Sequence, residues 1–419
     1  MGSELSMAAR AEVTARYARA YRGASKADKG RMLDEVVAVT GWSRDNARRR
    51  LAAAALPRAV RPRRRRRPSK YSYDAVKVLQ RVWAFGGGMC GKYLVVAMAG
   101  LLDALERHGE LVAGRGRYSP GVRAELLSMS AATVDRYLAP AKAADPLRGK
   151  TTTKASPLLR TSIKVRKATD ETEAEPGFFE GDTVAHCGPT SKGEFARTVN
   201  FTDVHTGWVL CRSVPNGAHR HVLGVLDALV ATVPFEVVGL DFDNGSEFIN
   251  HDVVAWAAGR KVFFTRARPY KKNDQATVES KNNHLVRRYA FYWRYDTAQA
   301  LALLNALWPL VCDRLNFLTP TKKPVEWGTT VTGRRKRLYD KPRTPFDRLC
   351  DAGVLSPDQQ AELTAYRDSL NPADLARRIQ TLQDKLTGLA RAATLDLQAA
   401  TAPKPVPDTT SSVRLRKAS

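Results

Sequence analysis

Residues 237–283 decide the fold, and they read VVGLDFDNGSEFINHDVVAWAAGRKVFFTRARPYKKNDQATVESKNN. The apolar run at 237–240 is typical of a short buried strand. The Asn-Gly pair at 244–245 predicts a turn soon after that strand. Asp243 is therefore expected at the end of the strand, next to the turn.

The second half of this stretch predicts another strand and then a helix. Residues 262–265 form the second apolar run, and from Gln275 onward the pattern is helical, with Glu279 and Asn282 on one face. Thirty-five residues separate Asp243 from Glu279. One acid is thus placed at the end of a strand and the other on a helix further along the same α/β domain.

These motifs resemble those of the retroviral integrase and insertion-sequence transposase superfamily. The segment DNGSEF at 243–248 is similar to the motif that holds the second catalytic Asp of that family. The segment ESKN at 279–282 is similar to the context of its catalytic Glu, at the same spacing. The family requires a third carboxylate on a neighbouring strand, and the run FFEGDTV at 178–184 offers Asp182.

The resemblance implies a polynucleotidyl transferase that uses Mg²⁺ or Mn²⁺, two ions per active site. Carboxylate oxygens suit these hard cations, and a pair of ions stabilises both the attacking and the leaving oxygen at a phosphodiester. By the resemblance, Asp182 would bridge both ions, Asp243 would complete one site and Glu279 the other. Asn282 would lie one helical turn beyond Glu279, as a DNA contact or a support for the metal ligands.

Other polar residues compete for these roles. Asp241 shares a strand face with Asp243, but the turn after Asp243 favours the latter. Asp203 is expected in a hairpin turn, Glu247 in a local loop or cap, and His186 in a structural position near a strand end.

The order of elements from residue 177 to residue 295 predicts an RNase H-like α/β catalytic core. Three β-rich runs come first, then a helix, a strand, a helix, a strand and a helix. The expected ranges are 178–185, 198–203 and 208–214 for the first strands, and 221–232 and 250–259 for the first helices.

Composition points to nucleic acid as the partner. The chain has 419 residues and a formal net charge of +26, and its basic residues are clustered. Such a surface binds phosphates. Five scattered cysteines lack metal-site spacing and are expected to be reduced, buried thiols. The absence of a signal pattern and of a long apolar span predicts a soluble, cytoplasmic protein, associated with the bacterial nucleoid when bound to DNA.

The first fifty-seven residues outline a helix-turn-helix. Helical patterns at 29–39 and 44–54 flank a Gly-containing turn, with Ser43 as the expected N-cap. The residues offered to DNA would be Arg44, Asn46, Arg48, Arg49 and Arg50. An ordinary helical hairpin with a solvated basic face is the alternative.

Two further regions extend the predicted DNA surface. The linker after the first module carries Arg63, Arg64, Arg65, Arg66 and Arg67 and would follow DNA as an extended arm, or simply be solvated. Residues 73–143 predict helices with a Gly86-Gly87-Gly88 turn, and 122–139 would be either a second helix-turn-helix, with Thr133, Asp135 and Arg136 exposed, or a structural helical subdomain. Around the catalytic site, phosphate contacts are expected from Lys271, Lys272, Lys281, Arg287 and Arg288.

The C-terminal region is expected to be helical and basic. Residues 321–348 would be a nucleic-acid surface or a connector, and their few alternating runs leave open whether this region forms a β-barrel. Asn371 would cap a helix whose stripe of Leu375, Ile379, Leu382, Leu386 and Leu389 either joins two protomers or packs on the protein itself.

The expected organisation is a multidomain chain with all-α modules, an α/β core and a basic helical end. Its segments are a helix-turn-helix module at 1–57, a linker at 58–72, a second helical module at 73–143, a linker at 144–176, the core at 177–295, the C-terminal region at 296–398 and a disordered tail at 399–419.

The expected function is that of a transposase acting on double-stranded DNA as a homo-oligomer, which cuts the ends of an element and joins them to target DNA. One alternative is an inactive relative that acts as a repressor or architectural DNA-binding protein. The other is a metal-dependent nuclease acting on RNA–DNA hybrids.

Overall fold

In a computed structural model of the chain, the described residues are 6–55, 70–143, 165–166, 175–242, 248, 250–267, 281–330, 333 and 335–401. The chain divides into two compact units, Met1–Lys70 and Tyr71–Ser419.

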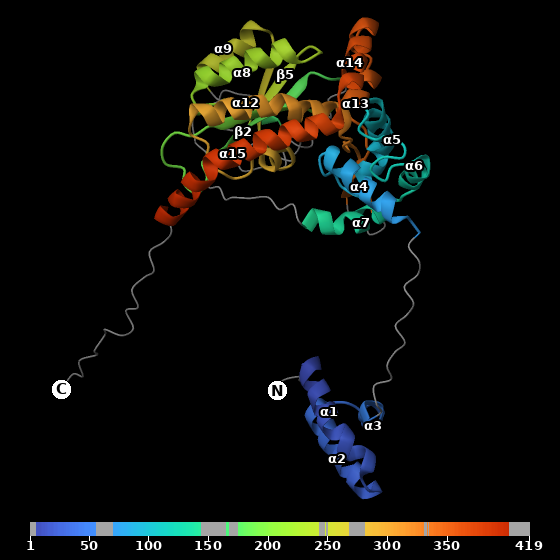
Figure 1. Ribbon diagram of the computed structural model, residues 1–419. Coiled ribbons are helices and arrows are strands. Elements are labelled where there is room, and N and C mark those ends of the chain that lie inside the picture. Colours follow the sequence, from blue (N-terminus) through green and yellow to red (C-terminus); the bar gives the residue numbers. More distant parts are fainter. Residues whose placement is uncertain are drawn as a thin grey trace, which may run out of the picture. The chain divides into compact units, whose positions relative to one another are not determined.

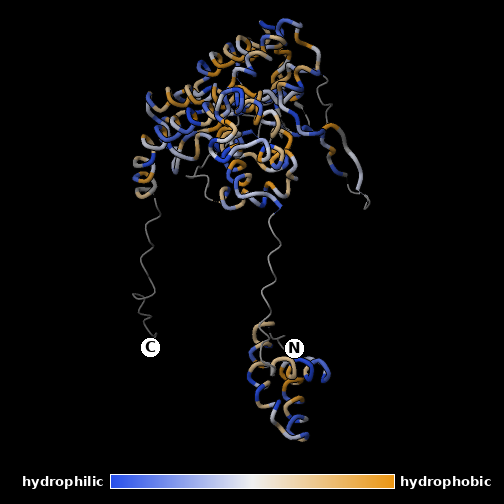
Figure 2. Tube along the Cα trace, turned by 45° about the vertical axis from the view of Figure 1, so that its right-hand side comes forward, coloured by the Kyte–Doolittle hydropathy of each residue, from blue (hydrophilic) through white to orange (hydrophobic). Residues whose placement is uncertain are grey.

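The first unit consists of three helices, α1 (Met7–Gly23), α2 (Lys26–Thr40) and α3 (Arg44–Ala55). The Ser43 hydroxyl accepts a hydrogen bond from the amide of Asn46, which confirms Ser43 as the N-cap of α3. Gly41, with φ of +69°, ends α2 and permits the turn into α3. Hydrophobic and hydrophilic residues alternate along the helices (Figure 2), and the core consists of Ala18, Tyr21, Leu33, Val36, Ala47 and Leu51.

The second unit begins with four helices, α4 (Tyr73–Phe85), α5 (Gly91–Arg107), α6 (Pro120–Leu127) and α7 (Ala131–Ala143). The predicted glycine turn lies between α4 and α5, with φ of +82° at Gly87 and +73° at Gly88. Asp135 of α7 accepts a hydrogen bond of 2.7 Å from the Gly91 amide. This residue, expected at an exposed DNA-facing position, is thus engaged with the N-terminus of α5.

A mixed sheet follows, with the strand order β1-β6-β5-β2-β3-β4. Strands β2, β3 and β4 are antiparallel, whereas β5 is parallel to β2, β6 to β5 and β1 to β6. The bounds are β1 (Val165–Arg166), β2 (Phe178–Ala185), β3 (Arg197–Asp203), β4 (Val209–Val214), β5 (Gly239–Phe242) and β6 (Phe263–Ala267). The predicted RNase H-like order is confirmed, and the two-residue β1 extends the sheet at its β6 edge.

Helices cover both faces of this sheet (Figure 1). On one face, α8 (His219–Thr232) and α9 (His251–Gly259) pack over Phe179, Phe201 and Leu240. On the other face lie a π-helical turn, η2 (Asn282–Arg287), its continuation α11 (Arg288–Ala290), and α12 (Ala298–Asp313). Among the described residues, one helical segment, Ala298–Leu318, has the length and apolarity of a membrane span, and more than half of it is buried as a core helix.

The C-terminal part adds η3 (Arg314–Leu318), a hairpin of β7 (Pro324–Thr329) and β8 (Arg335–Tyr339), and the helices α13 (Pro345–Asp351), α14 (Pro357–Ser369) and α15 (Pro372–Thr401). The sequence patterns did not predict the hairpin. In α15, Leu375, Ile379 and Leu386 are buried in the core shared with α12, while Leu389 is exposed. The leucine stripe therefore packs on the protein itself, which was one of the two predicted alternatives.

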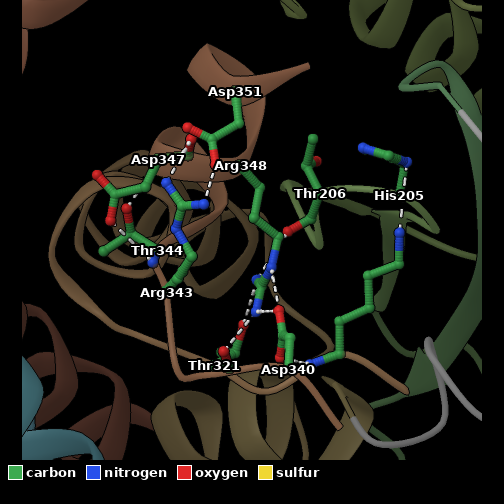
Figure 3. A network of polar contacts seen from close by, with 10 residues as sticks. His205, Thr206, Thr321, Asp340, Arg343, Thr344, Asp347, Arg348 and Asp351 are labelled. Carbon is green, nitrogen blue, oxygen red and sulfur yellow. Dashed lines mark hydrogen bonds and ion pairs between the residues drawn. The ribbon is translucent and has the colours of Figure 1, made fainter. Parts of the chain in front are cut away.

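A buried arginine ties the hairpin and α13 to the sheet (Figure 3). Arg348 pairs with Asp340 at 2.9 Å and donates to the backbone carbonyl of Thr206, in the turn between β3 and β4, at 3.1 Å. It also donates to the carbonyl and the hydroxyl of Thr321. One guanidinium group thus connects α13 to the turn between β3 and β4 and to the two residues, Thr321 and Asp340, that flank the hairpin.

Candidate active site

Asp182 lies on β2, where the sheet faces the helix at 281–290. In the antiparallel register it pairs with Asn200 on β3. Its Oδ2 accepts a hydrogen bond of 2.5 Å from the Asn282 side-chain amide, and its Oδ1 accepts one of 2.7 Å from the Thr183 backbone amide. The carboxylate is therefore held by two donors on a half-buried part of the sheet.

Asp243 and Glu279 lie outside the described residues, so the three-carboxylate site stays a prediction. Their described neighbours approach Asp182 from two directions. Phe242, the last residue of β5, pairs with Gly181 on β2. Asn282, three positions after Glu279, contacts Asp182 itself. The parts of the chain that flank the predicted ligands thus converge at Asp182.

A chain of side-chain hydrogen bonds leads from β4 to Asp182. The Cys211 thiol donates to Asn200 Oδ1 at 3.6 Å, Asn200 Nδ2 donates to Asn282 Oδ1 at 3.3 Å, and Asn282 donates to Asp182. Asn200 is completely buried. Sequence reasoning missed it, although an Asn within an apolar strand run is unusual enough to have indicated a special role.

The structure turns Lys281 towards the protein interior. Its ammonium group donates to the Gly207 carbonyl at 3.5 Å. Burial, followed by the nearby charge of Arg348, lowers the pKa of Lys281 to about 8. This contact links the start of the helix to the turn that Arg348 holds.

Two further basic residues of this helix also contact the protein. Arg287 is buried and donates to the Ala185 carbonyl at 2.9 Å, and Arg288 donates to the Gly87 carbonyl at 3.0 Å. The structure gives both side chains, like Lys281, a contact within the second unit. Their role as phosphate contacts stays a prediction.

On the predicted recognition helix α3, some basic residues form ion pairs within the first unit and others line a groove. Arg44 pairs with Asp34 on α2, and Arg48 pairs with Asp45 on α3 itself. Asn46 and Arg49 line an open groove of about 750 Å³ between α1 and α3. Arg50 and Trp42 also line this groove, and the Arg50 guanidinium lies over the Trp42 ring, 5.0 Å from its centroid. The remaining predicted DNA contacts, Arg63, Arg64, Arg65, Arg66, Arg67, Lys271 and Lys272, lie outside the described residues.

The competing polar residues have structural partners. Asp241 is completely buried, and its Oδ1 accepts a 2.6 Å hydrogen bond from the Thr265 hydroxyl. Asp203 accepts hydrogen bonds from the Gly177 and Thr206 amides, as expected for a turn residue, and burial raises its pKa. His186 is hydrogen-bonded to Thr198, and burial holds its pKa well below the usual range, which confirms its structural role. Glu247 lies outside the described residues.

The predicted set of three carboxylates, Asp182, Asp243 and Glu279, would suit a magnesium or manganese site. Within the part of the chain that the structure describes, no cluster of three His, Cys, Asp or Glu residues could hold a metal. Of the predicted ligands, the structure describes Asp182, whose carboxylate Oδ2 lies beside an amide donor. Three carboxylates are the oxygen donors that these hard cations prefer.

The strand order and the helices on both faces define the class of the fold, which is RNase H-like. Residues 173–272 match the integrase core domain family. The chain is 37% identical over 350 residues to "Uncharacterized protein y4rM" of Sinorhizobium fredii (strain NBRC 101917 / NGR234), covering 83% of this chain and 97% of that protein.

Among solved structures, the chain is similar to the catalytic core domain of BIV integrase, with 16% sequence identity and a TM-score of 0.28. That match covers 45% of this chain and 98% of the integrase chain. The protein belongs to the integrase core domain family.

Proposed function

We propose that this protein is the transposase of a bacterial mobile element. It would bind the element ends, hydrolyse a phosphodiester bond at each end, and join the liberated 3′-hydroxyl to target DNA. The observation that carries the proposal is the hydrogen bond between Asn282 and Asp182 inside an integrase core, since it joins the described parts of two predicted catalytic motifs.

The residues of the chain would divide the work between metal and DNA. Asp182, Asp243 and Glu279 would hold two Mg²⁺ or Mn²⁺ ions, which when bound stabilise charge on the attacking and leaving oxygens. Asn282 keeps the Asp182 carboxylate in a fixed orientation through its hydrogen bond. The net charge of +26 supports binding to duplex DNA, to which the N-terminal helices would add contacts at the element ends.

The proposal extends to assembly and location. Joining two element ends to one target calls for more than one active site, so we expect a homo-oligomer assembled on DNA. The protein would act in the cytoplasm, on the nucleoid.

The test is cleavage and strand transfer in Mg²⁺ on duplexes that carry the DNA flanking the gene. Each of Asp182→Ala, Asp243→Ala and Glu279→Ala is expected to lower the rate by at least about a thousandfold, because each would remove a metal ligand. Asp241→Asn is the matched control, since Asp241 is a carboxylate on the strand that ends beside Asp243 and is hydrogen-bonded to Thr265.

Two outcomes would contradict the proposal. Specific DNA binding by the wild-type protein without cleavage would instead indicate a repressor or architectural protein. Cleavage of an RNA–DNA hybrid but not of duplex DNA would instead indicate a metal-dependent nuclease that acts on such hybrids. A third outcome would change only the assignment of the metal ligand. Loss of activity in Asp241→Asn, with activity kept in Asp243→Ala, would assign that ligand to Asp241.

A further inference from the structure

The amide of Asn200 is placed to decide which way the Asn282 side chain points. Asn200 lies opposite Asp182 in the β2–β3 register and opposite Cys211 in the β3–β4 register. Its Oδ1 accepts from the Cys211 thiol, so its Nδ2 is directed at Asn282 Oδ1. An amide has one accepting and one donating end, and engaging the accepting end of Asn282 leaves its NH₂ group for Asp182.

The opposite orientation of Asn282 would be unfavourable for a metal ligand. Rotated by half a turn, Asn282 would direct its carbonyl oxygen at the Asp182 carboxylate, and two acceptors would face each other. Donors aligned in one direction, as they are from Cys211 to Asp182, reinforce one another in a buried site. Groups that orient a metal ligand in this way affect metal affinity without touching the metal.

We infer that Asn200 is a positioning residue for the divalent-ion site, acting on Asp182 through Asn282. This inference rests on the proposed function, because it assumes that Asp182 binds the metal. Asn200 itself is completely buried and would act through its hydrogen bond to Asn282.

The experiment measures Mn²⁺ binding to the full-length, DNA-free protein by calorimetric titration. Asn200→Leu keeps the size of the side chain and removes its donor, and we expect the Mn²⁺ affinity to fall about tenfold. Thr202→Val is the matched control. Thr202 lies two residues along β3, is completely buried, and its hydroxyl has no hydrogen-bond partner among the described residues, so Mn²⁺ affinity should stay unchanged.

A double-mutant cycle tests whether Asn200 acts through Asn282. In an Asn282→Ala background, Asn200→Leu should have no further effect on Mn²⁺ affinity, because the connecting amide is gone. Additive losses, or equal affinities of Asn200→Leu and Thr202→Val, would overturn the inference. Asn305→Leu controls for lost stability, since Asn305 binds the Ser213 backbone on β4 and has no place in this hydrogen-bond chain.

Mn²⁺ binding by Asp182→Ala keeps this test separate from that of the proposed function. Asp182→Ala should abolish Mn²⁺ binding; if the wild type and Asp182→Ala bind equally, the metal assignment itself fails, and the Asn200 inference fails with it. If Asn200→Leu does not fold, Asn200→Asp takes its place, because its carboxylate has nearly the same size and accepts rather than donates at Asn282.

Discussion

At the scale of single residues, two basic side chains of equal formal charge have different surroundings. Arg49 is exposed and lines the groove between α1 and α3. Lys281 donates to the Gly207 carbonyl, and burial lowers its pKa to about 8. A basic side chain that contacts a DNA phosphate contributes to the salt dependence of DNA binding. One whose charged group is hydrogen-bonded to a backbone carbonyl of the protein does not.

We therefore predict different salt dependences for Arg49→Ala and Lys281→Met. Arg49→Ala should weaken binding to any duplex and reduce the slope of log K against log salt concentration by about 1. Lys281→Met should leave that slope unchanged. Fluorescence anisotropy across a salt series measures both slopes. A reduced slope for Lys281→Met would show that Lys281 contacts DNA phosphate.

The residues of the site differ in how far the sequence could predict them. Asp182 and Asn282 lie in motifs whose chemistry is visible in the sequence, and the structure places them in contact. Asn200 lies in no motif, because its position follows from the pairing register of three strands. Register is a property of the folded sheet, so local periodicity could not show that Asn200 faces Asn282.

At the scale of elements, α15 links the helices α4–α7 to the sheet domain. Its buried face packs on α12, and Ala373 near its start lies in the core of α4–α7 (Figure 1). At the same end, Arg377 pairs with Glu110 at 2.7 Å, and Asn371 donates to the same carboxylate at 3.0 Å. Hydrogen bonds from Arg377 and then Asn371 lower the pKa of Glu110 to about 2.

This pair predicts an acid-dependent loss of stability. Because the folded-state pKa of Glu110 is depressed, its contribution is fully present above the unfolded pKa of about 4.3 and is lost as the pH falls towards 2. Glu110→Gln keeps the shape of the side chain and should remove about 1 to 2 kcal/mol at neutral pH, after allowance for solvent screening. Urea unfolding from pH 7 to pH 2 measures it, and the difference between the variant and the wild type should shrink steadily as the pH falls below the unfolded pKa. A constant difference across that range would contradict the assignment.

The type of an element could be predicted where apolar residues recur regularly along one of its faces. It could be predicted less well where tertiary contacts determine the local structure. The leucine period of α15 predicted a helix, but the partner of its apolar stripe was open until α12 was seen to cover it. The β7–β8 hairpin has a register shift between Pro324 and Glu326, and its root is held by the Asp340–Arg348 pair. A strand fixed by a distant arginine carries little local signal.

At the scale of the whole molecule, the chain forms two units with separate hydrophobic cores. The core of the first unit is small and entirely helical, whereas the second combines four helices, the sheet and the C-terminal helices. Because each unit has its own hydrophobic core, each can unfold in a cooperative transition of its own. Under the proposed function, this organisation would let end recognition and catalysis be carried by distinct folded bodies.

We therefore predict two calorimetric transitions, each sensitive to one core. Leu51 of α3 and Leu226 of α8 are both completely buried, and truncation of either to Ala should cost about 2 to 5 kcal/mol in its own unit. Leu51→Ala should lower the melting temperature of the smaller transition alone, and Leu226→Ala that of the larger. A single transition that both variants shift would mean that the two units unfold as one body, and recognition and catalysis would then share their stability.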